Sequence, residues 1–194
     1  MTVTDSPDRL AHYVERLEAV CGATAIVRDF PPFRPEAGRV AAVIFTDTPG
    51  KGYVTGFTYG LSLTSHPEWQ AGGRELSISV RSTAIEWAEV PARTVAALRG
   101  MGPFSRGQVV GYQQPYVPPS EMSSILLTTP WEEWQPDLAG LDLGTPGTET
   151  GDPIEVIGVC PIYASERDFV RSNGVDAFLG LPWDRFDPLR PPAV

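Results

Sequence analysis

The residues most suggestive of chemistry lie in one short loop. His66 and Glu68 flank Pro67, and Ser62 and Ser65 come just before them. A histidine oriented by a carboxylate could take the proton of a serine hydroxyl, which is the chemistry of a hydrolase. However, no G-x-S-x-G sequence is present, and Ser62 falls within a predicted strand. The sequence therefore favours a turn-forming role for this loop, with a hydrolase using the His66 loop as an alternative.

Other catalytic and metal-binding patterns are missing from the sequence. Cys21 and Cys160 form no CxxC motif and have no histidine at metal-ligand spacing, so we interpret both as buried packing thiols. There is no H-x-x-x-H, no EF-hand spacing and no phosphate-binding G-x-x-x-x-G-K-[ST] order. We therefore expect no catalytic residue, no metal site and no cofactor.

The net charge of −9 is concentrated in one stretch. No Lys, Arg or His lies between Gly107 and Glu166, whereas acidic and basic residues balance in the rest of the chain. Such a stretch repels phosphate backbones and anionic lipid and attracts cationic proteins. We expect a cationic protein partner, no nucleic acid and no membrane; the alternative is that the acids only keep a Pro/Gly-rich loop solvated. The acidic residues are Glu121, Glu132, Glu133, Asp137, Asp142, Glu149, Asp152, Glu155 and Glu166.

Two tryptophans lie within this acidic stretch. Aromatic rings beside carboxylates suit a protein interface, in which the rings supply buried area and the acids supply specificity. The alternative is that the rings pin a loop onto the domain. The predicted partner-binding residues of this region are Glu121, Trp131, Glu132, Glu133, Trp134 and Asp137.

The periodicity of apolar residues predicts helices at the start, middle and end of the chain. Ser6 and Pro7 suit a helix start, an apolar stripe follows, and Gly22 suits the helix end. A second helix is predicted from Pro91 to Arg99. The last begins at Ser165 with Asp168 in a capping box and ends at Asn173-Gly174, followed by one more turn over 175–179.

Seven segments are predicted as strands, and short connections favour antiparallel neighbours among the first three. The predicted fold is α+β: a mixed, mostly antiparallel β-sheet flanked by N-terminal, middle and C-terminal helices. Residues 1–180 form the single domain, and 181–194 form a Pro-rich tail extended on its surface. Residues 130–153 are expected to be an irregular connection, mobile around 144–151. The strands are 24–28, 39–45, 53–63, 74–81, 108–112, 125–129 and 154–163.

An ordered set of short motifs over roughly residues 55–180 resembles the suppressor of fused domain family, specifically its bacterial stand-alone type. No single motif is diagnostic, but their order and spacing together are fairly specific. They are Gly56-Phe57-Thr58-Tyr59-Gly60-Leu61-Ser62-Leu63, Pro67-Glu68-Trp69, Arg74-Glu75-Leu76-Ser77-Ile78-Ser79-Val80, Trp87, the Pro91 helix, Phe104, Leu126-Leu127-Thr128, Val156-Ile157-Gly158-Val159-Cys160 and Asn173-Gly174.

This resemblance implies a non-catalytic protein-binding domain. Eukaryotic members hold a transcription-factor peptide as an added strand, and the strand used on this side resembles residues 107–112. The corresponding binding residues are Gln108, Val109, Val110 and Tyr112, with Gln108 where those members carry an aspartate. Strand addition requires this segment to lie at a sheet edge.

The stand-alone type further implies an immunity protein that neutralises a cationic toxin; a regulatory domain binding an extended peptide is the alternative. A cytoplasmic location is expected, because the N-terminus has no signal-peptide pattern and the longest apolar run, 40–45, is too short to span a membrane.

Overall fold

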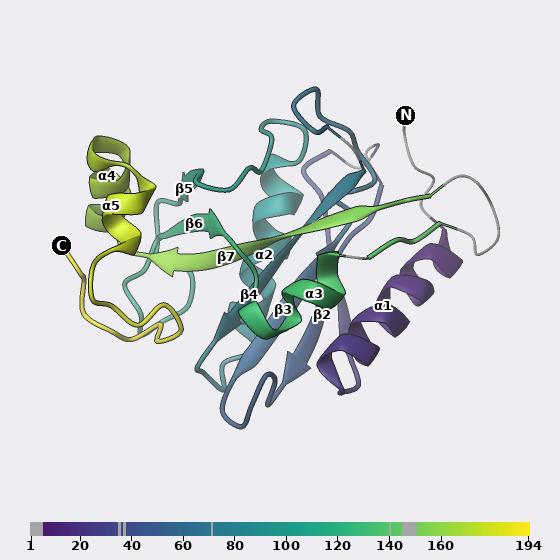
Figure 1. The fold of residues 1–194 in the computed structure, drawn as a ribbon, viewed down its shortest axis with the longest axis horizontal. Helices are drawn as coiled ribbons and strands as arrows, with labels where there is room; N and C mark the ends of the chain where they lie inside the picture. The colour runs from purple at the N-terminus through teal and green to yellow at the C-terminus, as the bar shows by residue number, and fades with distance from the viewer. Residues whose placement is uncertain (1–5, 35, 37, 71, 140, 145–150) are drawn as a thin grey trace.

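Seven strands form one sheet in the part of the chain that the computed structural model describes, residues 6–34, 36, 38–70, 72–139, 141–144 and 151–194. Their order across the sheet is β1-β2-β3-β4-β7-β6-β5 (Figure 1). The strands are β1 (Ile26–Phe30), β2 (Val40–Thr46), β3 (Val54–Tyr59), β4 (Gly73–Val80), β5 (Val109–Gly111), β6 (Ser124–Thr128) and β7 (Ile154–Ile162). The helices are α1 (Pro7–Cys21), α2 (Glu86–Leu98), the 3₁₀ helix η2 (Glu132–Trp134), α3 (Gln135–Ala139), α4 (Ala164–Asn173) and α5 (Val175–Leu179).

The sheet is mixed and mostly antiparallel, as predicted. Only β4 and β7 run parallel, and every other neighbouring pair is antiparallel. The chain between β4 and β7 contains α2, β5, β6 and α3, which is long enough for the crossover that a parallel pair needs. β1 and β5 are the two edges of the sheet.

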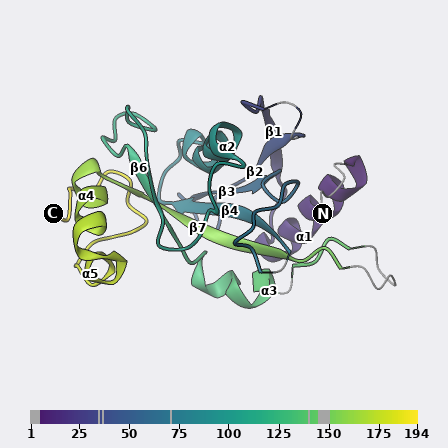
Figure 2. The same ribbon diagram turned by 90° about the horizontal axis from the view of Figure 1, so that it is seen from above.

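The two faces of the sheet are covered by different helices (Figure 2). On one face, Trp87, Val90 and Val95 of α2 pack against alternate residues of β2, β4 and β7. On the other face, Tyr13 and Leu17 of α1 pack beside the residues of η2 and α3. This alternation between the two faces is the period-two pattern expected of a sheet with a core on each side.

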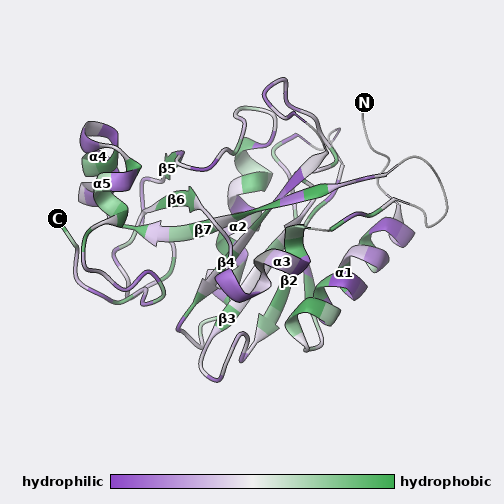
Figure 3. Ribbon diagram, in the orientation of Figure 1, coloured by the Kyte–Doolittle hydropathy of each residue, from purple (hydrophilic) through white to green (hydrophobic). Residues whose placement is uncertain are grey.

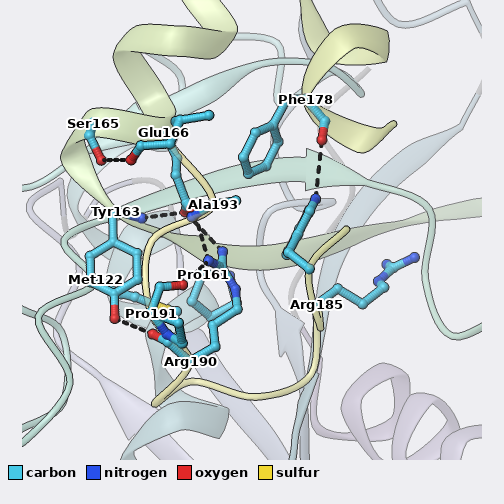
Figure 4. A network of polar contacts seen from close by, with 12 residues as sticks. Met122, Pro161, Tyr163, Ser165, Glu166, Phe178, Arg185, Arg190, Pro191 and Ala193 are labelled. Atoms are coloured by element: carbon cyan, nitrogen blue, oxygen red, sulfur yellow. Dashed lines mark hydrogen bonds and ion pairs between the residues drawn. The ribbon is translucent and has the colours of Figure 1, made fainter. Parts of the chain in front are cut away.

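A third cluster lies where β6 and β7 extend beyond the other strands. Here α4 and α5 cover Leu126, Cys160 and Ile162, and the aromatic residues Phe178 and Trp183 pack together. The segment 181–194 contains no helix or strand, but Arg190 is buried and hydrogen-bonded to Glu166 (Figure 4). The tail thus packs into the domain instead of lying only on its surface.

The first helix has the predicted ends and the predicted stripe. The side chain of Ser6 accepts a hydrogen bond from the backbone of Arg9, and Gly22 adopts the left-handed conformation after the last turn. Figure 3 shows the mixture of polar and apolar residues along α1 that this amphipathic pattern requires. One residue departs from the pattern, because Arg9 is buried together with the apolar residues.

The middle helix begins earlier than predicted. It starts at Glu86, so Pro91 lies inside the helix, not at its start. A proline there removes one backbone hydrogen bond, a cost that is ordinarily about 3 kcal/mol. Burial of Trp87 and Val90 against the sheet offsets this cost, and it is a long-range effect that the local proline signal does not report.

Several other boundaries differ from the predictions, including that of β1, which spans Ile26–Phe30 and not 24–28. The third strand ends at Tyr59, because Gly60 has a φ of 122° and the chain turns there. The irregular connection 130–153 contains η2 and α3, and its residues 145–150, including Glu149, lie outside the described residues. The fourth helix begins at Ala164, so Glu166, not Asp168, takes the capping position by accepting the Tyr163 N–H at 2.8 Å.

Candidate protein-binding site at the β5 edge

The strand β5 lies at one end of the sheet and pairs only with β6. Val109 is opposite Leu126 and Gly111 is opposite Ser124. The Tyr112 N–H donates to the Ser123 carbonyl at 2.7 Å. Because residues alternate along an antiparallel pair, the N–H and C=O groups of Val109 and Gly111 point away from β6. The edge condition for strand addition, left open by the sequence, is therefore met.

A groove of about 310 Å³ runs beside this edge. It lies between the end of α2 and the outer side of the strand. Val110 packs toward the α2 core, and the exposed Tyr112 ring stacks on Tyr116 with 5.9 Å between ring centroids. Burial raises the pKa of Tyr116 to about 12, and the neighbouring Tyr112 adds to the shift, so this hydroxyl stays neutral. The groove is lined by Leu98, Met101, Gly102, Phe104 and Gln108–Gly111.

The loop that lines the groove is held by two residues from the motifs that carry the family resemblance. The indole N–H of Trp69 donates to the Pro103 carbonyl at 2.7 Å. The Arg74 guanidinium donates to the same carbonyl at 2.9 Å and to the Ser105 hydroxyl at 3.0 Å. Phe104 between them is buried with a φ of 48°, a conformation that a bulky residue adopts only when its surroundings hold it. The wall of the groove is therefore a fixed feature of the fold.

The other side of β5 is formed by α4. A side chain at Gly111 would lie 2.6 Å from Nη1 of Arg167, so the arginine crosses directly over this glycine. Val109 packs against the buried cluster that includes Leu126 and Val170. The strand thus has a free edge, with the groove beside α2 on one of its faces and α4 packed against the other.

Gln108 has a different environment from its predicted partner-binding neighbours. Its side-chain Oε1 accepts the Ser105 N–H at 3.3 Å, its own N–H donates to the Ser105 carbonyl, and its carbonyl accepts the Leu127 N–H. These bonds close the turn that leads into β5. Of the four residues predicted for strand addition, Val109, Val110 and Tyr112 lie along the edge, and Gln108 positions it.

The acidic stretch divides into paired and unpaired residues. Asp152 pairs with Arg9, Glu155 with Arg74 and Arg106, and Glu166 with Arg190. Thus part of the negative charge that the sequence concentrates here is neutralised by arginines from distant segments. Five exposed residues have no ion pair among the described contacts, namely Glu121, Glu132, Glu133, Asp137 and Asp142.

The two tryptophans of this stretch lie against the sheet. Trp134 is buried, with its ring 6.1 Å from that of Phe57. Trp131 is half-buried between Phe186, at 4.5 Å, and Tyr53, at 5.8 Å. These contacts favour the loop-pinning interpretation for Trp134, and they leave only part of Trp131 accessible beside Glu132 and Glu133.

The loop considered for hydrolase chemistry has no serine–histidine pair among its described contacts. The hydroxyl of Ser62 donates to Glu75 at 2.7 Å and accepts from Arg9 at 2.9 Å. His66 Nδ1 accepts the backbone N–H of Glu68 at 3.2 Å, which is the local bond of a turn. Ser62 also lies in the turn after β3, not in the strand that the sequence predicted.

The residue that organises this region, Glu75, was not identified from the sequence. It is buried and accepts hydrogen bonds from the Thr58 and Ser62 hydroxyls and from the backbone of Gly60–Ser62. Burial raises the pKa of Glu75, and these hydrogen bonds oppose the shift. A carboxylate alternating with apolar residues within β4 was the only sequence signal for it. Its contacts with Gly60, Leu61 and Ser62 fix the turn after β3.

The remaining predictions of chemistry concern thiols, metals and membranes. Cys21 and Cys160 are free, and burial raises the pKa of both thiols to about 12. No group of three or more His, Cys, Asp or Glu side chains in the described part of the chain could hold a metal ion. Among the same residues, no helix is both long and apolar enough to cross a membrane.

Fold and site together define an α+β domain in which the sheet edge formed by β5 lies beside a groove. The chain belongs to the Suppressor of fused protein (SUFU) family, whose model matches residues 37–191. None of the curated proteins matches it in sequence. The match to the family model confirms the resemblance inferred from the short motifs.

Solved structures with the same fold include bacterial and animal proteins. A SUFU homologue from Neisseria gonorrhoeae FA 1090 has a TM-score of 0.62 at 16% identity, with 96% of this chain and 95% of that chain covered. A chain of the Sufu–Fu complex has a TM-score of 0.62 at 10% identity, with coverage of 97% and 93%. Drosophila Suppressor of Fused has a TM-score of 0.53 at 10% identity; 96% of this chain spans about half, 51%, of that one.

Proposed function

We propose that this chain is a non-catalytic protein-binding domain that takes an extended segment of another protein as an eighth strand beside β5. The observation that carries the proposal is the outward orientation of the Val109 and Gly111 backbone next to a preformed apolar groove. Backbone hydrogen bonds would supply affinity, and the groove would select every second side chain. The Sufu–Fu complex, in which a protein of this fold binds another protein, supports this class of function.

Val109→Pro tests the proposal because it removes one outward N–H while leaving the bonds to β6 in place. Val109→Ala is the matched control, since it shortens the same side chain and keeps the N–H. The probe is a displayed library of random peptides about twice the length of a typical strand of ~5–6 residues. Peptides selected on the wild-type domain should bind Val109→Ala and lose binding to Val109→Pro. Equal binding to both variants would reject strand addition.

A second binding surface is proposed at η2 and α3. Glu132, Glu133 and Asp137 are exposed on this short segment next to the half-buried Trp131. These carboxylates would attract a cationic partner, and close charge pairs across an interface couple by about 1.5–7 kcal/mol. We extend this proposal to an immunity role against a cationic toxin in the cytoplasm, which an acidic surface suits because it attracts a positively charged partner.

The experiment for the acidic surface is a pull-down from the native cell at low and high salt. The variant in which both Glu132 and Glu133 are replaced by lysine should fail to retain proteins that the wild type retains at low salt. The control carries the same charge change elsewhere, at the exposed Glu15 and Glu68. Retention by the Glu132/Glu133 variant equal to that of the control would reject this surface.

A further inference from the structure

A second apolar groove adjoins the one beside β5. It lies between the segment after β1 and the last turns of α2. Phe30, Pro31 and Phe33 form one side, and Ala96, Ala97 and Met101 form the other. Phe33 is 77% exposed and Met101 is 64% exposed, which is unusual for large apolar side chains. The backbone N–H of Phe33 donates to the Ala96 carbonyl at 2.8 Å, so the two sides are fixed to each other.

Met101 belongs to both grooves. It lines the β5 groove together with Leu98 and the Phe33 groove together with Ala97. The exposed apolar surface is therefore continuous around the end of α2, from Val110 over Met101 to Phe33. A chain segment paired with β5 and leaving the strand on this side would meet the second groove next.

One end of the second groove carries excess positive charge. Arg93 lines the groove and pairs with Glu89, and Arg28 pairs with the same carboxylate at 2.6 Å. Two guanidinium groups thus share one buried carboxylate, whose side chain is 8% exposed, while the two arginines are 43% and 46% exposed. One positive charge is left over at the groove, with N–H donors that still face solvent. The excess charge at this groove is positive, whereas the net charge of the chain is −9.

We propose that these two grooves form one binding track. The partner segment that pairs with β5 continues across Met101, inserts an apolar side chain between Phe33 and Met101, and places an acidic side chain on Arg93. The inference rests on strand addition at β5 and adds the partner's sequence class: an extended stretch followed by an apolar residue with a nearby Asp or Glu. Apolar contact would provide most of the affinity, and the carboxylate would provide selectivity.

The test uses peptides selected from the random library on the wild-type domain. Their binding is measured by fluorescence anisotropy against Phe33→Ser, Arg93→Gln and Val109→Pro. Arg93→Gln leaves the Arg28–Glu89 pair in place, and Phe33 is exposed, so both variants should keep the melting temperature of the wild type. Leu189→Ser and Arg171→Gln are matched controls, since they make the same changes at exposed residues far along the chain.

The selected peptides should carry an acidic residue next to an apolar one, and Phe33→Ser and Arg93→Gln should each weaken their binding by roughly fivefold or more. Changing the peptide's acidic residue to its amide should weaken binding to the wild type but not to Arg93→Gln, because the two changes remove the same contact. Equal losses in both backgrounds would overturn the placement of the carboxylate on Arg93.

The outcomes separate this inference from strand addition itself. If the peptides bind Val109→Pro weakly but bind Phe33→Ser and Arg93→Gln as tightly as the wild type, the continuous track is wrong and strand addition still holds. If the peptides bind Val109→Pro as tightly as the wild type, strand addition is rejected, and the binding track is rejected with it. Light scattering that shows a dimer of the wild type, converted to a monomer by Phe33→Ser, would also overturn the inference, because a second copy would then occupy the groove.

Discussion

The guanidinium group of Arg190 donates to both carboxylate oxygens of Glu166, at 2.5 and 2.8 Å, and both side chains are buried. The two residues come from the tail and from the first turn of α4 (Figure 4). The Arg190 guanidinium also lies over the Trp183 ring, 4.5 Å from its centroid. Glu166 further accepts the backbone N–H of Ala193 at 2.8 Å. This ion pair therefore fixes the tail to the domain, because burying either charged side chain without the other would be strongly unfavourable.

Arg190→Met should destabilise the domain strongly. It keeps most of the apolar stem of the side chain but leaves Glu166 buried without its cation, for which a loss of about 3–5 kcal/mol is expected. The free energy of unfolding in urea measures the effect. Leu189→Ala at the neighbouring exposed residue should stay within about 0.5 kcal/mol of the wild type. If Arg190→Met and Leu189→Ala have the same free energy of unfolding, the ion pair does not hold the tail.

Sequence reasoning succeeded where the determining contacts are local. Ser6, Pro7 and Gly22 mark the ends of α1 by backbone chemistry within a few residues, and all three have the roles that their types predict. The alternation in β2–β4 and the apolar run of β7 likewise identify a sheet with a core on both sides. The mixed sheet follows from these elements together with their connection lengths.

Distant contacts explain what sequence reasoning missed. Glu166 and Arg190 are 24 residues apart in the chain, and Arg9 and Asp152 are 143 apart, so no local pattern indicates that they pair. Because these partners were hidden, the acidic stretch was expected to carry more free charge than it does. The site was foreseen only in part: Val109, Val110 and Tyr112 came from the family resemblance, and nothing in the sequence placed Phe33 beside Met101.

The stability of the domain should depend on pH through Glu75. Burial raises the pKa of this carboxyl, opposed by hydrogen bonds from Thr58, Ser62 and the backbone of Gly60, so the native state holds the proton to a higher pH than the unfolded chain. The resulting stabilisation is fully present below the unfolded pKa of about 4.3 and is lost as the pH rises through the native pKa.

Glu75→Gln removes this titration and serves as the comparison. The free energy of unfolding of the wild type minus that of the variant should fall as the pH rises from about 4 toward neutrality. Urea unfolding of both proteins over a pH series measures the difference. A difference that grows with pH would mean that the hydrogen bonds to the carboxylate outweigh its burial.

Two glycines in the sheet should not tolerate a methyl group. A Cβ at Gly56 would lie 2.1 Å from the Ala88 carbonyl oxygen of α2, and one at Gly158 would lie 2.0 Å from the Thr129 carbonyl oxygen. Backbone would have to move in both cases, at a cost of about 1–3 kcal/mol or more. Gly50→Ala is the control, since nothing lies within 4 Å of its Cβ position. Melting temperatures should drop for Gly56→Ala and Gly158→Ala and stay unchanged for the control.

Both thiols should be unreactive in the native protein. Burial raises the pKa of Cys21 and Cys160 to about 12, whereas an unfolded cysteine has a pKa near 8.5, so little native thiolate exists at pH ~8. Titration with a chromogenic disulfide reagent should therefore be at least about a hundredfold slower in buffer than in denaturant. Rapid labelling of Cys160 without denaturant would show that the cluster around α4 and the tail opens readily.

The β5 edge makes a prediction that needs no partner. Tyr112 N–H is bonded to β6, and by alternation so is that of Val110, whereas the Val109 and Gly111 amides face outward. Amide hydrogen exchange followed by NMR should therefore be slow at Val110 and Tyr112 and fast at Val109 and Gly111. Val159 of β7, which pairs with Ile78 of β4 on one side and with Leu127 of β6 on the other, gives the reference for a fully paired strand. Protection of Val109 and Gly111 in the free monomer would mean that another segment already covers the edge, and no strand could then be added there.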